Sequence, residues 1–185
     1  MLKDILKELE KKMKVSTEHF RKELSKLRTG RANINIFEDI KVTYYGTLTP
    51  INQVATLGVP DPTLVVIQPW DPSVLESLEK AVRGSEYGFN PINDGKVLKV
   101  PIPPLDEERR REIAKRIGKM MEEEKTALRN MRREAKEFIE ELEKEKEITE
   151  DDKFQGLEKL QSLLDDHIKK IEELAATKEK EILER

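Results

Sequence analysis

Apolar residues recur every three or four positions in two parts of the chain, over the first thirty residues and again after residue 105. This spacing places the apolar side chains on one face of an α-helix. The pattern predicts three helices: residues 1–30, about 107–146, and from about 150 onward. The apolar stripe expected on the second helix comprises Ile113, Ile117, Met120, Leu128, Met131, Ala135, Phe138 and Leu142.

Polar residues mark the ends of the last two helices. Asp106 stands where its carboxylate can cap the second helix, and Thr149 can cap the third. The short connection between them makes the two helices antiparallel neighbours. The first helix must join them to bury its own apolar face, so an elongated three-helix bundle is expected.

The centre of the chain has a different pattern. All nine prolines lie between Pro50 and Pro104, where they prevent long helices. β-Branched and aromatic residues predict strands at 40–45, 64–68 and 97–100. Asp71 followed by Pro72 is a good start for a short helix that extends to about Arg83. This part is expected to be a small β/α/β domain, which makes the fold class α+β.

Two short crossings connect these parts. Residues 1–30 and 105–185 are expected to form the bundle, with residues 31–104 inserted as the small domain. Gly30 gives one crossing backbone freedom, whereas Pro103 and Pro104 stiffen the other. This combination is compatible with a hinge of limited swing and equally with a rigid elbow.

Composition argues against most catalytic chemistry. The chain has 185 residues, no cysteine and a formal net charge of -3. It contains no phosphate-binding glycine motif, and its two histidines, His19 and His167, lack metal-ligand spacing. We therefore expect no catalytic residue, no metal site and no cofactor. There is no apolar run of membrane-spanning length and no leader sequence, which favours a cytoplasmic protein without a membrane partner.

Charge is distributed unevenly. Residues 1–31 hold ten basic residues against five acidic ones, and residues 109–133 hold ten against four. Residues 134–185 hold ten against eighteen. The first two helices are therefore basic in an acidic chain, a pattern typical of contact with a polyanion.

Helical phase groups some of these cations. At about 100° per residue, one sector of the second helix lies away from the apolar stripe. It contains Arg111, Lys125, Arg129, Arg132 and Lys136. An exposed arginine sector suits phosphate groups, but charge alone slightly favours a solvated face. A second basic group, near the end of the first helix, contains Lys22, Lys26, Arg28 and Arg31. Compensation of the helix dipole explains Lys26 and Arg28 but does not require Arg31.

Several motifs together resemble the ribosome recycling factor family. They are Leu27-Arg28-Thr29-Gly30-Arg31-Ala32, Tyr44-Tyr45-Gly46-Thr47-Leu48-Thr49-Pro50, Val100-Pro101-Ile102-Pro103-Pro104-Leu105, Glu107-Glu108-Arg109-Arg110, Arg129-Asn130-Met131-Arg132-Arg133 and Ile148-Thr149-Glu150-Asp151-Asp152. Asp106 stands where the resemblance leads us to expect threonine or serine, and aspartate caps a helix equally well. The resemblance extends over essentially the whole chain.

The resemblance implies an L-shaped, monomeric, two-domain translation factor. With elongation factor G and GTP, such factors split the post-termination ribosome and release messenger and transfer RNA. The bundle would bind ribosomal RNA of the large subunit, and the small domain would meet elongation factor G. Arg132 would be the main RNA contact, supported by Arg129, Arg133, Arg28 and Arg31. Gly30, Pro103 and Pro104 would be hinge positions.

Helical phase adds Lys125 and Lys136 to the candidate RNA contacts but leaves Arg133 as close to the acids of the bundle as to a phosphate. The absence of a leader favours a bacterial member over an organellar one. Two other classes stay open from the residues alone. The first is a non-ribosomal helical protein-interaction module, such as a chaperone cofactor or coiled-coil adaptor. The second is a hydrolase hidden in the small domain.

Overall fold

The chain folds into two compact units in a computed structural model that describes residues 2–184. One unit takes the chain up to Leu24 and again from Arg111 onward; we call it the helical unit. The other comprises Ser25–Arg110, and we call it the sheet unit. Long helices in one and antiparallel sheets in the other confirm the expected α+β class. The predicted boundaries near residues 30 and 105 both fall inside the sheet unit.

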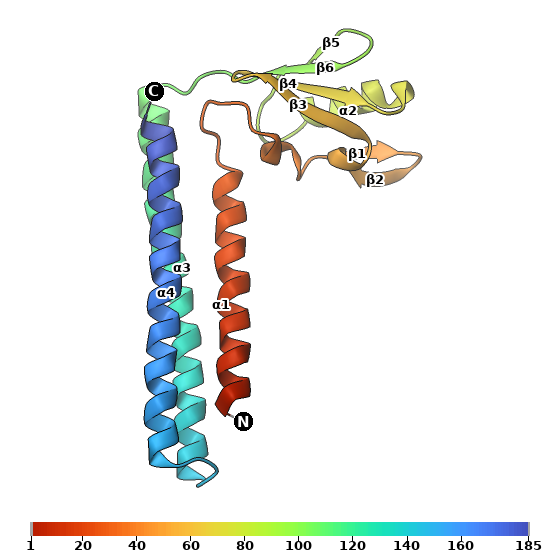
Figure 1. Ribbon diagram of the computed structural model, residues 1–185. Helices are drawn as coiled ribbons and strands as arrows, with labels where there is room; N and C mark the ends of the chain where they lie inside the picture. The colour runs from red at the N-terminus through yellow and green to blue at the C-terminus, as the bar shows by residue number, and fades with distance from the viewer. Residues whose placement is uncertain (1, 185) are drawn as a thin grey trace. The chain divides into compact units, whose positions relative to one another are not determined.

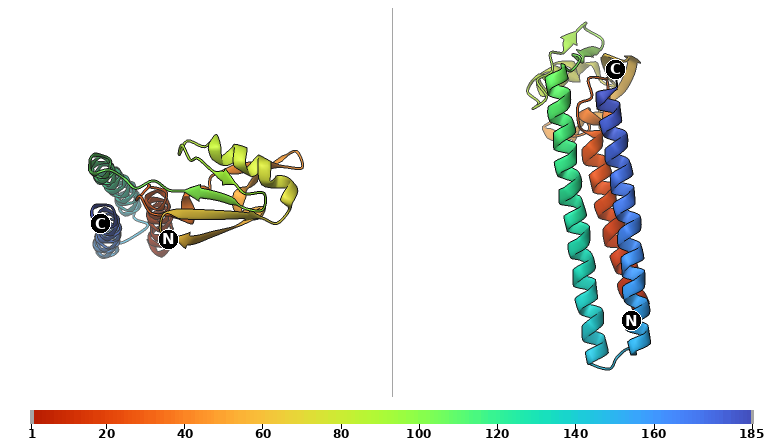
Figure 2. Two further views of the ribbon diagram at one scale, coloured as in Figure 1. Left: turned by 90° about the horizontal axis from the view of Figure 1, so that it is seen from above. Right: turned by 90° about the vertical axis from the view of Figure 1, so that its left-hand side faces the viewer.

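Three long helices make up the helical unit: α1 (Leu2–Ser25), α3 (Glu107–Lys144) and α4 (Glu150–Leu183). They lie side by side, with α1 and α4 running in one direction and α3 in the other (Figures 1 and 2). The bounds of α3 and α4 agree with the prediction to within about two residues, whereas α1 ends at Ser25, before the predicted end at residue 30. Among the described residues, no helix is both long and apolar enough to cross a membrane.

The predicted caps are confirmed. The Asp106 carboxylate accepts a hydrogen bond from the backbone N–H of Arg109 at 2.7 Å. Thr149 and Asp152 form a capping box, in which each side chain accepts a bond from the other residue's backbone N–H. Between the helices, Lys146 has a φ of 63°, in the left-handed region that favours glycine.

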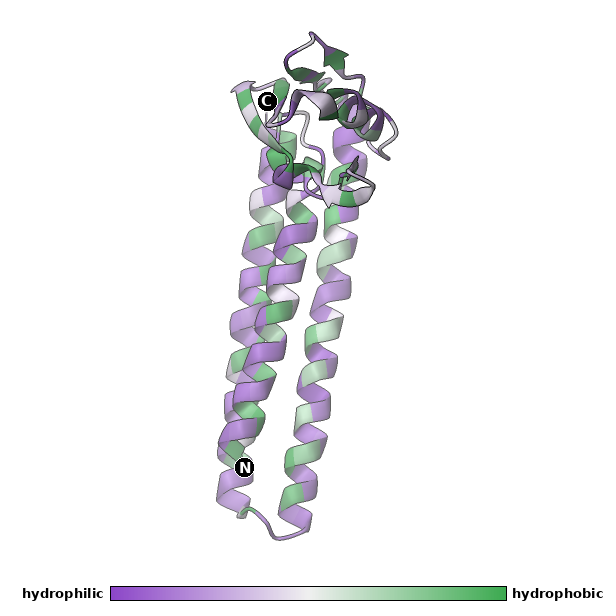
Figure 3. Cartoon of the chain, turned by 90° about the vertical axis from the view of Figure 1, so that its right-hand side faces the viewer, coloured by the Kyte–Doolittle hydropathy of each residue, from purple (hydrophilic) through white to green (hydrophobic). Residues whose placement is uncertain are grey.

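Apolar side chains from all three helices are buried in the core of the helical unit. Apolar positions recur along the helices as green bands between polar ones in Figure 3. Fully buried examples are Met13, Ile117, Leu128, Ile139, Leu160 and Ile171. The expectation that Phe138 belongs to the buried stripe is wrong, because its side chain is 49% exposed. Phe138 lies at the edge of the α1–α3 interface, where it borders a groove with Ile5 and Leu9. Its neighbour Ile139 is buried instead.

The sheet unit contains two antiparallel sheets. Strands β1 (Lys41–Tyr44) and β2 (Thr47–Pro50) form a hairpin. Its two turn residues, Tyr45 and Gly46, have φ values of 45° and 78°, as a tight type I′ turn requires. The second sheet has the order β3-β4-β6-β5 and contains β3 (Ala55–Asp61), β4 (Leu64–Pro69), β5 (Ile92–Asn93) and β6 (Leu98–Pro101).

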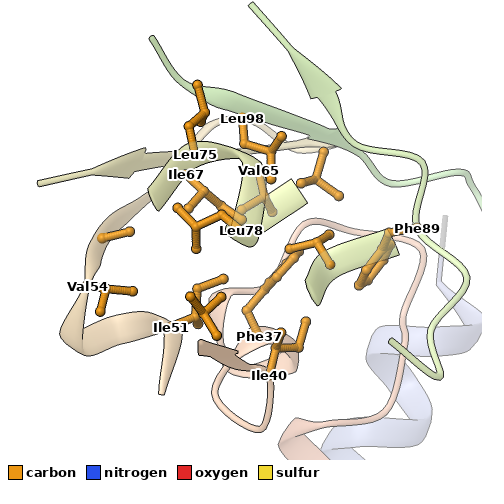
Figure 4. Packing of buried hydrophobic residues seen from close by; sticks show 14 of the residues in the cluster. Phe37, Ile40, Ile51, Val54, Val65, Ile67, Leu75, Leu78, Phe89 and Leu98 are labelled. Atoms are coloured by element: carbon orange, nitrogen blue, oxygen red, sulfur yellow. The ribbon is translucent and has the colours of Figure 1, made fainter. Parts of the chain in front are cut away.

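One helix, α2 (Leu75–Arg83), completes the core of the sheet unit, together with short 3₁₀ turns at Ile34–Phe37, Ile51–Gln53 and Pro72–Val74. Figure 4 shows Leu78 of α2 packed with Val65 and Ile67 of β4 and with Phe37. Among the aromatic residues of the sheet unit, Phe89 is buried, and Tyr44 and Tyr87 pack partly buried against the core. Tyr45 and Trp70 are 82% and 65% exposed.

Candidate nucleic-acid interface

The candidate site is a group of cations on the middle of α3. Arg129 and Arg133 are exposed, and neither pairs with another residue in the described part of the chain. Arg132 is half-buried, and its guanidinium donates a hydrogen bond to the side-chain oxygen of Gln161 on α4 at 3.0 Å. This short segment therefore presents three arginines, and no carboxylate of the described chain pairs with any of them.

Lys125 differs from these arginines. Its side chain is only 11% exposed, and its ammonium group lies 2.6 Å from Glu172 of α4 and 3.2 Å from Glu122. The hydrogen bond from the Glu172 carboxylate raises the pKa of Lys125 above its ordinary value. The expectation that Lys125 belongs to an exposed, unneutralised sector is therefore wrong. The Lys125 side chain lies on the side of α3 that packs against α4. Helical phase alone could not show which side of α3 faces α4.

Lys136 is an intermediate case. Its ammonium group lies 3.5 Å from the Glu140 carboxylate one turn along α3, and both side chains are about two-fifths exposed. Such pairs are weak in water and are screened by salt. Lys136 can therefore exchange Glu140 for another anion at little cost.

Arg28 and Arg31 belong to the sheet unit and are described separately from α3. The Arg28 guanidinium lies over the Phe89 ring, 5.3 Å from its centre, and donates to the Tyr87 carbonyl oxygen at 2.9 Å. These contacts hold Arg28 against the core of its own unit. Arg31 is exposed and has no partner among the described residues, so its guanidinium is available to a ligand.

The predicted hinge residues also lie in the sheet unit. Gly30 has a φ of 76°, and a Cβ at this position would come within 3.0 Å of the Leu105 backbone nitrogen. Glycine is therefore needed there both for its conformation and for close packing. Pro103 and Pro104 are exposed in the returning segment. Whether the chain bends at these three residues stays a prediction.

The two histidines lie on different helices, His19 on α1 and His167 on α4. His167 is buried, and its Nδ1 lies 2.9 Å from the Thr17 hydroxyl oxygen, which links α4 to α1. Burial lowers the pKa of His167, and nearby Lys170 acts in the same direction. His19 is exposed on α1. Among residues 2–184 no cluster of three or more histidine, cysteine or acidic side chains could hold a metal ion.

The sequence did not single out Gln161. A signal for it does exist, because antiparallel helices pair residues at similar separations on either side of their connection. Lys153 and Glu143 pair across the same α3–α4 seam at 3.1 Å, and Lys125 pairs there with Glu172. The same register brings Gln161 opposite Arg132.

Comparison with known proteins decides the family. The family model described as "Ribosome recycling factor" matches residues 20–183. The chain belongs to the ribosome recycling factor family. A ribosome-recycling factor of Syntrophomonas wolfei is 50% identical to it over 184 residues, and one of Desulfosudis oleivorans is 47% identical. In both comparisons all of each chain is covered.

Solved structures of the family agree with the fold. A solution structure of a ribosome recycling factor has a TM-score of 0.82 and 47% identity, and the match covers 100% of this chain and 98% of that one. A second match has a TM-score of 0.69 and 42% identity, with 99% of both chains covered. It is the Thermus thermophilus ribosome recycling factor, described with Escherichia coli elongation factor G as bound to the Escherichia coli post-termination complex.

Proposed function

We propose that this member of the ribosome recycling factor family binds the large ribosomal subunit through the arginines of α3 and recycles ribosomes after termination. The observation that carries the site is the pair of unpaired arginines, Arg129 and Arg133, beside the half-buried Arg132. These arginines concentrate positive charge locally in a chain whose formal net charge is -3. The family is one of translation factors, so a polyanionic ribosomal RNA is the natural partner for these cations.

Arginine suits this partner for a physical reason. Its planar guanidinium presents several N–H donors that match two oxygens of one phosphate. Each phosphate that the protein neutralises also releases condensed counterions, which makes binding strongest at low salt. Lys136 and Arg31 would add weaker phosphate contacts. Lys125 and Arg28 would act inside the protein, because their charged groups are already held by its own residues.

The remaining roles follow from the family. The sheet unit would face elongation factor G, the partner that accompanies the Thermus thermophilus relative on the post-termination complex. GTP would be hydrolysed by elongation factor G, and the protein itself would catalyse no reaction. It would act as a monomer in the bacterial cytoplasm. Gly30, Pro103 and Pro104 would permit the angle between the helical unit and the sheet unit to change during subunit splitting.

Binding to purified large subunits at several salt concentrations tests the site. Arg132→Ala, and separately the double variant Arg129→Ala/Arg133→Ala, should weaken binding. Each lost phosphate contact should reduce the slope of log K against log salt by about one. Lys159→Ala removes an exposed cation from α4 and serves as the control. Unchanged binding by both arginine variants, with their circular dichroism intact, would show that these arginines do not form the interface.

Subunit splitting tests the activity itself. The protein should split post-termination ribosomes when elongation factor G and GTP are both present, and the arginine variants should need a higher protein concentration to do so. An absence of splitting by the parent protein under these conditions would refute the proposed function.

A further inference from the structure

Among residues 2–184, three cations make contacts across the seam between α3 and α4, and their partners differ in charge. Lys125 is held by the carboxylates of Glu122 and Glu172. Lys153 of α4 is held by the Glu143 carboxylate of α3 at 3.1 Å. Arg132 instead bonds to the neutral side-chain amide of Gln161. Two of these cations are therefore neutralised inside the protein, and one keeps its full charge.

Gln161 is itself held in a fixed orientation. Its side-chain oxygen accepts from the Arg132 guanidinium at 3.0 Å, and its side-chain nitrogen donates to the Asp165 carboxylate at 2.9 Å. The Asp165 bond requires the amide nitrogen to face Asp165, which turns the amide oxygen toward Arg132. Within residues 2–184 Asp165 makes no ion pair with Arg132, so its carboxylate orients the amide without binding the guanidinium.

Arg132 is partly withdrawn from water. Its Nε atom is buried and has no hydrogen-bond partner in the described part of the chain. A guanidinium in this position has lost part of its hydration, so a phosphate displaces less water from it than from a freely solvated arginine. It has also lost part of its rotamer freedom before any ligand arrives, which reduces the entropy cost of binding.

We infer that Gln161 is a positioning residue for Arg132: it fixes the guanidinium on the α3–α4 seam without cancelling the charge that a phosphate would bind. A glutamate in its place would hold Arg132 at least as firmly, but it would compete with the ligand. This inference rests on the proposed function, because it assumes that Arg132 contacts ribosomal RNA.

The test is Gln161→Glu, with Gln155→Glu as its matched control. Gln155 is exposed on the same helix, six residues or about 9 Å along the axis from Gln161. Both variants add one negative charge to α4, but only the first places it against Arg132. The measurements are affinity for purified large ribosomal subunits at several salt concentrations and the midpoint of urea unfolding.

Gln161→Glu should lower the affinity about tenfold and reduce the salt slope by about one, because Arg132 would then be neutralised inside the protein. Its unfolding midpoint should change little, since the new charged pair with Arg132 is offset by the lost bond to Asp165 and by repulsion from that carboxylate one turn away. Gln155→Glu should change the affinity less than twofold. The replacement of a residue with a merely structural role would not lower the affinity and the salt slope while leaving the stability nearly unchanged.

Gln161→Ala provides a second readout that keeps the charge of Arg132 free. It should lower the affinity about threefold with the salt slope unchanged, because the phosphate contact is kept but its donor is no longer fixed. In an Arg132→Ala background, Gln161→Glu should have no further effect beyond that of Gln155→Glu.

Two results would overturn the inference while leaving the proposed function in place. One is equal binding by Gln161→Glu and Gln155→Glu when Arg132→Ala is weakened. The other is a loss of affinity on Gln161→Glu that is equally large in the Arg132→Ala background. If Arg132→Ala itself binds as the parent does, the role proposed for Arg132 fails, and the role of Gln161 fails with it.

Discussion

Replacing Lys125 by alanine tests whether this lysine serves the core of the helical unit. Alanine keeps the Cβ and removes three further methylene groups from a side chain that is 11% exposed. At about 0.8 kcal/mol for each buried methylene, the stem contributes about 2 kcal/mol. The ion pairs add less than a fully buried pair would, because Glu122 and Glu172 are 60% and 52% exposed. A contribution of about 0.2–1 kcal/mol is appropriate for such pairs.

The expected loss for Lys125→Ala is therefore about 2–3 kcal/mol of unfolding free energy. Lys125→Met keeps an apolar stem of similar length and removes the charge, so it should lose about 1 kcal/mol or less. Lys119→Ala is the control on the same helix. Its side chain is 79% exposed and lies 3.8 Å from Glu123, so its loss should be within about 0.5 kcal/mol.

Urea unfolding followed by two signals separates the units. Circular dichroism at the helix band is dominated by α1, α3 and α4, whereas the chain's single tryptophan, Trp70, lies in the sheet unit. Lys125→Ala should lower the midpoint of the circular-dichroism transition. A value within about 0.5 kcal/mol of the parent would refute the assignment of Lys125 to the core. Equal losses for alanine and methionine would show that the charge, and not the stem, carries the stabilisation.

Three further substitutions or conditions give expected outcomes by the same measurements. Because burial lowers the pKa of His167 in the folded state, its contribution to stability is complete above the ordinary value of 6.5 and decreases as the pH falls below it. Between pH 7.5 and 5, His167→Gln should therefore lose less unfolding free energy than the parent protein does. An equal loss in the two proteins would contradict this reasoning. Gly30→Ala should destabilise the sheet unit by about 1–2 kcal/mol, because alanine is strained at a φ of 76° and its Cβ would crowd the Leu105 backbone; an unchanged Trp70 fluorescence transition would disprove it. Lys146→Gly should stabilise the helical unit by up to about 1 kcal/mol, since glycine accepts a φ of 63° without strain, and a lower circular-dichroism midpoint would count against that.

The helices were predictable because their signals are local. Apolar spacing located α1, α3 and α4, and Asp106 and Thr149 satisfy backbone N–H groups within a few residues of themselves. The strands were less accessible. β3 contains Gly58 and Pro60, and its register with β4 shifts between Gly58 and Asp61. Its buried and exposed residues do not alternate, so the sequence lacks the pattern by which a strand is recognised.

The candidate site shows the same division. Helical phase placed Arg129 and Arg132 away from the apolar stripe, and within residues 2–184 neither has a carboxylate partner. It could not separate Lys125 from them, because the burial of Lys125 depends on Glu172, 47 residues away along the chain. Likewise, the contacts of Arg28 with Tyr87 and Phe89 are set by tertiary packing. Charges on a helix surface acquire their roles only when the neighbouring elements are in place.

The insertion of the sheet unit into the helical unit has a consequence for synthesis on the ribosome. The sheet unit is one continuous stretch of chain and can fold as soon as it emerges. α1 emerges first, but its side-chain partners are on α3 and α4, where Ser16 bonds Glu124 and Thr17 contacts His167. At about 5–20 residues per second, α4 is completed roughly ten to thirty seconds after α1. During that interval the nascent chain has a folded sheet unit that follows α1, while the apolar face of α1 is not yet buried against α3 and α4.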